Sequence, residues 1–187
     1  MITPNDFKNG LTLEIDGEVY LIIEYQPVKP GKGTAFTRTR LKNLRSKKII
    51  DRTYRVDERF QEAFVEEKRL QYLYNNGTHY HFMDQGTYEE QEIAREHLED
   101  VIKYLKENME LTAVVYKSEV IDVHLPIFIE ASVIHTEPGV KGDTAKGSFK
   151  PATIETGATV QVPLFINEND RIKIDTRTGD YVERISS

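Results

Sequence analysis

The sequence of 187 residues contains no cysteine, which excludes disulfide bonds, thiolate metal sites and a cysteine nucleophile. It also lacks the Gly-x-Ser-x-Gly turn that carries the nucleophile of many hydrolases. No apolar run is long enough to cross a bilayer. The segment from Met1 to Asp6 lacks the basic and apolar regions of a signal peptide. These absences predict a cytoplasmic protein with no membrane partner.

Acidic residues are missing from one long stretch of the chain. The formal net charge is −6, yet no acidic residue occurs between Tyr25 and Ile50. The same stretch holds eight basic residues: Lys29, Lys32, Arg38, Arg40, Lys42, Arg45, Lys47 and Lys48. A basic run in an otherwise acidic chain favours directed contact with nucleic-acid phosphate. A solubilising strand face explains the charges equally well at this stage.

Within the basic run, one lysine stands between two glycines directly after a proline. Pro30 fixes its own φ and biases Lys29 towards an extended conformation. Gly31 and Gly33 permit positive φ and close approach of the backbone. Because strand-like sequence lies on both sides, we predict a β-hairpin with Lys32 as the most projecting group at its tip. An ordinary solvated turn with an exposed lysine is the alternative.

Alternating apolar and polar residues fill most of the chain and predict an all-β protein made of three units. Residues 1–64 contain about five short strands, typical of a small barrel resembling the SH3 fold. Residues 65–126 suit an OB-type barrel, and residues 127–187 form a further all-β unit. One short helix is predicted in the central unit from the helical spacing of four apolar residues, Leu98, Val101, Ile102 and Leu105.

Two features raise the question of a catalytic or metal site. His79 and His81 flank one residue on a strand and therefore face the same side, but no third ligand is evident. Clusters of acidic residues have no apolar pocket beside them that would raise a carboxylate pKa. They lie at residues 66–67, 89–92 and 99–100. We therefore predict no metal, no cofactor and no catalytic residue.

Sequence motifs distributed from end to end of the chain occur together in one family. They lie at residues 5–10, 28–36, 71–74, 82–84, 104–109, 136–145, 150–157, 162–166 and 175–182. The C-terminal signature, made of residues 150–157, 162–166 and 175–182, is especially specific. On these motifs the sequence resembles bacterial translation elongation factor P. One departure is Asn169, where the family usually has glycine. Because asparagine tolerates left-handed backbone geometry, we expect the turn to be kept.

The resemblance implies an SH3-like (KOW-like) barrel followed by two OB-fold barrels, in an L-shaped arrangement similar to tRNA. It also implies a monomeric, non-enzymatic translation factor of the cytoplasm. Such a factor binds the 70S ribosome between the P and E sites. There it contacts peptidyl-tRNA and rRNA and relieves stalling at consecutive prolines by promoting peptide-bond formation.

The resemblance further assigns roles to individual positions. Lys32 matches the residue that a lysine-modifying enzyme acts on in many members and that reaches the peptidyl-transferase centre. The other predicted contacts are Arg38, Arg40 and Lys42 with tRNA or rRNA phosphates, Gly142, Asp143, Thr144 and Ala145 with the E-site codon of the mRNA, and Tyr181 and Arg184 with the ribosome. A free-standing OB-fold RNA-binding module is the alternative function, although it leaves the glycine-flanked lysine unexplained.

Overall fold

The structure, a computed structural model, describes residues 1–138 and 149–185. This part of the chain forms three five-stranded sheets and contains no α-helix, which confirms the predicted all-β class. The strands are β1 (Thr12–Ile15), β2 (Glu18–Val28), β3 (Phe36–Asn43), β4 (Ile49–Arg55), β5 (Gln61–Glu62), β6 (Glu66–Asn75), β7 (His79–Asp84), β8 (Glu90–Ala94), β9 (Glu110–Tyr116), β10 (Glu119–His124), β11 (Phe128–Thr136), β12 (Phe149–Ile154), β13 (Thr159–Pro163), β14 (Arg171–Asp175) and β15 (Asp180–Ile185).

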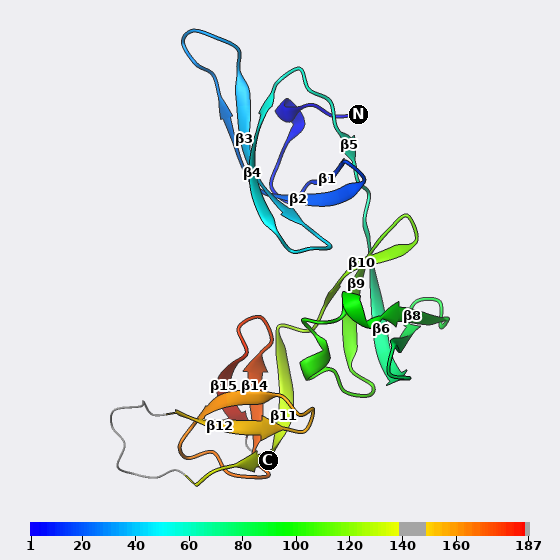
Figure 1. Ribbon diagram of the computed structural model, residues 1–187, viewed down its shortest axis with the longest axis vertical. Coiled ribbons are helices and arrows are strands. Elements are labelled where there is room, and N and C mark those ends of the chain that lie inside the picture. Colours follow the sequence, from blue (N-terminus) through cyan, green and yellow to red (C-terminus); the bar gives the residue numbers. More distant parts are fainter. Residues whose placement is uncertain (139–148, 186–187) are drawn as a thin grey trace. The chain divides into compact units, whose positions relative to one another are not determined.

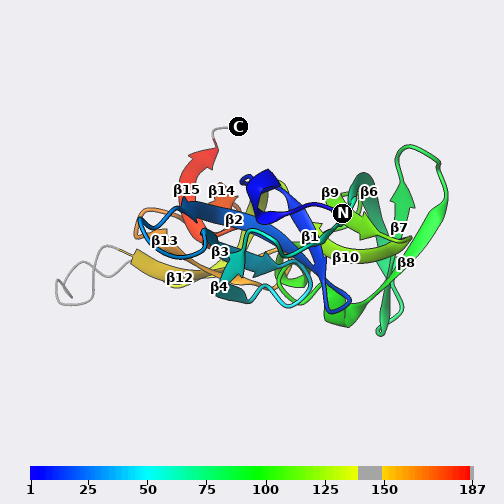
Figure 2. The ribbon, with the colours of Figure 1, turned by 90° about the horizontal axis from the view of Figure 1, so that it is seen from above.

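The first sheet has the strand order β4-β3-β2-β1-β5 and curls against the 3-10 helix η1 (Pro4–Asp6), as Figures 1 and 2 show. Its core consists of Phe7, Leu11, Leu13, Ile22, Leu41 and Tyr54. The rings of Tyr54 and Phe60 pack edge to face, with centroids 4.6 Å apart. Alternate residues of β3 are buried, with Leu41 in this core, so the residues between them are left on the outer face of the sheet.

The second sheet has the strand order β10-β9-β6-β7-β8. The short helical segment expected here is present as two 3-10 helices, η2 (Arg95–His97) and η3 (Ile102–Tyr104), and not as the α-helix that the spacing indicates. Leu98, Val101, Tyr104 and Leu105 are buried. Asn108, at φ 64°, follows the segment before β9 begins.

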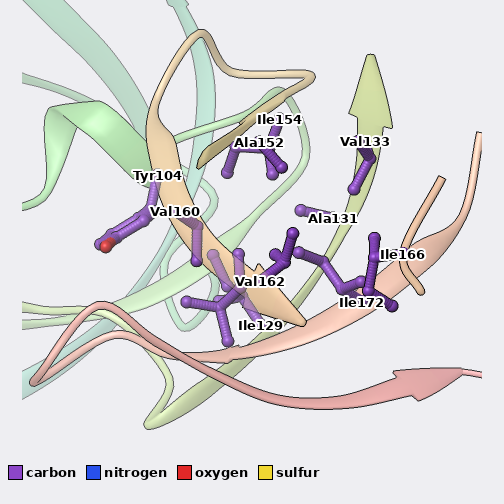
Figure 3. Packing of buried hydrophobic residues seen from close by; sticks show 11 residues of the cluster. Tyr104, Ile129, Ala131, Val133, Ala152, Ile154, Val160, Val162, Ile166 and Ile172 are labelled. Atoms are coloured by element: carbon purple, nitrogen blue, oxygen red, sulfur yellow. The ribbon is translucent and has the colours of Figure 1, made fainter. Parts of the chain in front are cut away.

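The third sheet has the strand order β13-β12-β11-β14-β15. Its core is almost entirely aliphatic and includes one ring from outside the sheet, that of Tyr104 in η3. Figure 3 shows this ring beside Val160. The turn before β14 contains Asn169 at φ 70°, in the left-handed region, which confirms that the turn is kept without glycine. The Asn169 backbone N–H donates to the carbonyl of Val133 at 2.8 Å.

Close contacts divide the chain into two compact units that do not follow the sequence in simple order. The first comprises Met1–Lys68 with Ala113–Asp122, and the second comprises Arg69–Thr112 with Val123–Ser187. Strands β6, β9 and β10 therefore each pass from one unit to the other. The predicted boundaries at residues 64 and 126 stay predictions about independently folding domains.

The first unit gains a hairpin end from β9 and β10. Apolar residues of this hairpin pack with residues of the N-terminal sheet in a cluster of Val19, Leu44, Ala63, Val114 and Ile121. Polar contacts surround the cluster: the Tyr116 hydroxyl donates to Glu14 at 2.5 Å, and Lys117 pairs with the same carboxylate at 3.0 Å. Both contacts lower the pKa of Glu14, with the Tyr116 hydrogen bond as the larger cause. Apolar and charged contacts together therefore hold the end of the β9–β10 hairpin against the N-terminal sheet.

Candidate functional site

The predicted lysine tip is the loop between β2 and β3, which extends beyond the rest of the first sheet in Figure 1. The two strands pair antiparallel, with Val28 opposite Phe36. Lys32 is the midpoint of the seven residues 29–35 between them. Its side chain is exposed and makes no hydrogen bond or ion pair with any residue that the structure describes. The amine is therefore accessible to a modifying enzyme or to a partner.

The two glycines beside Lys32 differ in what the backbone requires of them. Gly33 has φ +105°, a conformation that side-chain-bearing residues rarely adopt. Gly31 is outside the positive-φ region, and a Cβ built on it would meet no atom of the described chain within 4 Å. Only Gly33 is therefore needed for the turn itself.

The basic run does not form one continuous stripe. Lys29 and Lys32 lie in the tip, and three further cations alternate along the outer face of β3, namely Arg38, Arg40 and Lys42. The remaining ones lie beyond the other end of β3. There Arg45 pairs with Glu119 at 2.9 Å, and Lys47 pairs with the buried carboxylate of Asp122. Arg45 and Lys47 are thus paired with carboxylates of the first unit.

The three cations of β3 differ in their partners. Arg40 lies between two carboxylates, with Nε 3.0 Å from Asp51 and Nη1 3.8 Å from Glu24. The hydrogen bond and charge of Asp51, and then the charge of Glu24, raise the pKa of Arg40. Arg38 instead has its guanidinium over the ring of Phe36, 5.7 Å from the centroid. Sequence reasoning missed both carboxylates.

A shallow hollow opens on this face of the sheet. It is lined by Glu24, Gln26, Arg38, Thr39, Arg40, Asp51, Arg52 and Thr53. The hollow therefore brings together Arg38 and Arg40, two of the three predicted phosphate contacts. Its lining residues from β2 and β4 are all polar or charged. Lys42 lies further along β3, at the position that pairs with Leu21 and Ile49.

The predicted C-terminal contacts belong to the second compact unit. Tyr181 is half-buried and packs against the core of the third sheet. Arg184 is exposed, with its guanidinium 5.9 Å from the centre of the Phe165 ring and 3.8 Å from Asp170. Figure 2 shows both residues' strand, β15, at the edge of the sheet beside β14. The predicted codon loop, Gly142, Asp143, Thr144 and Ala145, lies outside the described residues.

His79 and His81 lie on one face of β7, as predicted, and carboxylates of β8 lie opposite them. His81 Nδ1 is 2.7 Å from Glu90, and the ring stacks on Tyr74 with centroids 4.4 Å apart. His79 lies 3.5 Å from Glu92. Across residues 1–138 and 149–185, no group of three or more His, Cys, Asp or Glu side chains is arranged to hold a metal ion. In the same ranges no helix has the length and apolar character of a membrane span.

Comparison with known proteins gives matches along the whole chain. Three models of elongation factor P match in order: the KOW-like domain over residues 3–60, the OB domain over residues 65–123 and the C-terminal domain over residues 129–184. With the three sheets, these matches confirm the resemblance and the predicted order of barrels. The sequence is also 53% identical over 185 residues to elongation factor P of Natranaerobius thermophilus, covering 99% of this chain and 98% of that protein.

Further relatives agree with this. Elongation factor P of Moorella thermoacetica is 53% identical over 184 residues, which cover 98% of this chain and 100% of that protein. Among solved structures, eukaryotic translation initiation factor 5A from Methanococcus jannaschii matches with a TM-score of 0.50 and 21% identity, over 65% of this chain and 92% of that one. A translation initiation factor of the same kind from Naegleria fowleri matches with a TM-score of 0.54 and 13% identity, over 66% and 96%. These two structures share the fold over about two thirds of the chain.

Proposed function

Because the chain belongs to the elongation factor P family of translation factors, we propose that it binds the ribosome between the P and E sites. There it stimulates peptide-bond formation and relieves stalling at consecutive prolines. The observation that carries this proposal is the exposed, unpartnered Lys32 at the midpoint of a projecting hairpin. A lysine held out on a narrow loop reaches a recessed reaction centre that a barrel cannot enter.

The proposed role of Lys32 is positional. Proline has no backbone N–H and a fixed φ, so a nascent proline run holds peptidyl-tRNA in poor geometry for reaction. Lys32, with any group attached to its amine, limits the motion of the CCA end and restores alignment. Orientation of two reactants contributes several kcal/mol to a reaction barrier. Lys32 exchanges no proton in this scheme, so the protein acts without being an enzyme.

The remaining contacts follow from the same proposal. The outer face of β3, through Arg38, Arg40 and Lys42, contacts tRNA or rRNA phosphates, which fixes register without reading sequence. Tyr181 and Arg184 engage the ribosome from the C-terminal barrel. The segment Gly142 to Ala145 approaches the E-site codon. The protein acts in the cytoplasm as a monomer built of three consecutive domains, and a lysine-modifying enzyme is its further partner.

Reconstituted translation tests the proposal. We expect the protein from its native host to relieve stalling on a message that encodes a proline run, and to leave a matched message without the run unchanged. Lys32→Ala removes most of this relief while leaving thermal stability unchanged, because Lys32 is exposed and forms no hydrogen bond or ion pair with the residues that the structure describes. Lys29→Ala is the matched control, since it removes the same charge from the same exposed loop. Equal losses in both variants would contradict a specific role for Lys32.

A free-standing RNA-binding module remains the second candidate, favoured by the basic face of β3 alone. It predicts tight binding to isolated RNA and no effect on the proline stall. A wild-type protein that fails to relieve the stall yet binds RNA tightly would replace the first proposal by the second.

A further inference from the structure

Arg40 lies opposite Glu24 because the strands of the β2–β3 hairpin pair symmetrically about Lys32. In the β2–β3 hairpin, Glu24 pairs with Arg40, each eight residues from Lys32. On the other side of β3, Arg40 pairs with Asp51 of β4. The three side chains therefore stand in one row across three strands, on the outer face of the sheet. All three are about half exposed or more, at 68%, 49% and 71% of the side chain for Glu24, Arg40 and Asp51.

The contacts of Arg40 occupy the donors that a phosphate would use. Nε and Nη2 approach the two carboxylate oxygens of Asp51 at 3.0 and 3.5 Å, in the side-on geometry that also suits a phosphate. Nη1 faces Glu24 at 3.8 Å. A phosphate that binds Arg40 must therefore displace Asp51 and approach two negative charges.

Arg38, two residues away on the same face, has the opposite environment. The residues paired with it across the sheet are Gln26 and Thr53, both uncharged. Its guanidinium lies over Phe36 and forms no ion pair with any residue of the described chain. One available and one restrained arginine thus line the same hollow.

We infer that Glu24 and Asp51 are specificity-determining residues, which compete with phosphate for Arg40. A freely diffusing RNA strand then contacts Arg38 alone at this hollow. A tRNA or rRNA backbone that is fixed in place on the ribosome also displaces the carboxylates and binds Arg40. This inference rests on the proposed contact of the β3 face with RNA. It explains why a face built for phosphate carries two carboxylates at its centre.

The strength of the ion pairs suits this role. Exposed ion pairs contribute little free energy and exchange readily. A phosphate held at high effective concentration by the rest of a docked complex can therefore displace them, whereas a freely diffusing strand gains little by doing so. Affinity for freely diffusing RNA grows with the number of phosphates that the protein neutralises. Because Arg40 is held by carboxylates, it does not add to that number, and affinity for such RNA is lower.

The test compares binding of a fluorescently labelled oligouridine by the full-length wild type and by Glu24→Gln/Asp51→Asn. We expect the double variant to bind about two- to fivefold more tightly at low salt. We also expect the dependence of log affinity on log salt to steepen by about 0.7, the value for one additional single-strand phosphate contact. The charge-matched control is Glu130→Gln/Glu183→Gln, which releases Arg171 and Lys173 from ion pairs in the C-terminal barrel.

Arg40→Ala then shows whether the gain comes through Arg40. In the wild type this substitution should change oligouridine affinity by less than twofold, and in the double variant it should abolish the gain. Equal affinity of the double variant and the charge-matched control would overturn the inference, as would a gain that survives Arg40→Ala. The proline-stall assay separates the two proposals. If the wild type relieves the stall but the double variant gains no RNA affinity, only the inference about Glu24 and Asp51 fails.

Discussion

Two hairpin loops of this protein contain similar residues but differ in the contacts that these residues make. The tip at residues 29–35 and the turn between β14 and β15 each contain a basic residue and a glycine at positive φ, Gly33 and Gly179. In the tip, no side chain from Lys29 to Thr34 forms a hydrogen bond or ion pair with the described chain. In the C-terminal turn, nearly every residue forms a hydrogen bond with the rest of the chain.

Three parts of the chain contact the C-terminal turn: Asp175, the segment at residues 126–127, and Tyr104. Arg177 donates to both oxygens of Asp175, at 3.0 and 2.6 Å. The Thr176 hydroxyl donates to the carbonyl of Pro126 at 2.7 Å, and its backbone N–H donates to Ile127 at 2.9 Å. Gly179 lies against the hydroxyl of Tyr104. The C-terminal turn is thus held by contacts with its own chain, whereas the side chains of the tip stay exposed, as the proposed role of Lys32 requires.

The largest effect is expected from Gly179→Ala. The new Cβ would lie 2.8 Å from the Tyr104 hydroxyl, and φ +79° strains any side chain. Because the Tyr104 ring is buried in the core of the third sheet, it has little room to withdraw. We expect a loss of about 2–4 kcal/mol in the free energy of unfolding, measured by urea denaturation.

Gly157→Ala separates the two causes of that loss. Gly157 has a similar φ of +87°, but a Cβ there would meet no described atom within 4 Å. Its substitution should therefore cost only the backbone term, about 1 kcal/mol. Adding Tyr104→Phe to Gly179→Ala should recover part of the loss. Equal costs at the two glycines would show that the contact with Tyr104 contributes nothing.

A smaller effect is expected from Asp175→Asn, and it depends on pH. The hydrogen bonds donated by the Arg177 side chain lower the pKa of Asp175 to about 2. An aspartate in an unfolded chain has a pKa of about 3.9. Because the folded value is lower, the stabilisation is complete above about pH 4 and is lost as the pH falls towards 2.

Urea denaturation of the wild type and Asp175→Asn across this range measures the effect. The wild type should be the more stable at neutral pH, and the difference should shrink between about pH 4 and 2 and vanish below pH 2. The carboxylate of Glu14 also titrates in acid, but it does so equally in both proteins and cancels in the difference. A difference that stays constant from neutral pH to pH 2 would contradict the assignment to the charged form of Asp175.

The two loops also show what sequence could predict. The position of Lys32 followed from local rules, because proline and glycine restrict the backbone wherever they stand. The turn at Asn169 followed for the same reason. The spacing predicted an α-helix where the structure has 3-10 helices, although three of its four apolar residues, Leu98, Val101 and Leu105, are buried. The sequence did not show that Tyr104 of the same segment packs in the core of the third sheet. That contact lies between residues distant in the chain.

The carboxylates beside Arg40 are an intermediate case. Pairing the strands symmetrically about Lys32 would have placed Glu24 opposite Arg40, so the first partner was accessible from the sequence. Asp51 was not, because its position depends on the register of β4. A turn without glycine or proline sets that register, closed by hydrogen bonds to Asn43 and by Lys47 at φ 60°. The split of the basic run was hidden likewise, since Arg45 and Lys47 meet partners near residue 120. Local geometry was predictable, and long-range pairing was not.

The smallest effect on stability, and the sharpest test of the comparison, is expected from Gly31→Ala. Neither φ nor crowding within the described chain requires glycine at this position, so the free energy of unfolding should stay within about 0.5 kcal/mol of wild type. If the tip enters a narrow site on the ribosome, the added methyl group displaces Lys32 and should lower the rate of stall relief on the order of tenfold.

Mass spectrometry of Lys32 in the same preparation shows whether its modification is intact. This measurement separates poor action of the tip on the ribosome from poor recognition of the tip by the modifying enzyme. Unchanged relief would mean that the receiving site leaves room beside Gly31. A loss of stability would mean that the tip is held by its own chain after all, and the contrast with the C-terminal turn would fail.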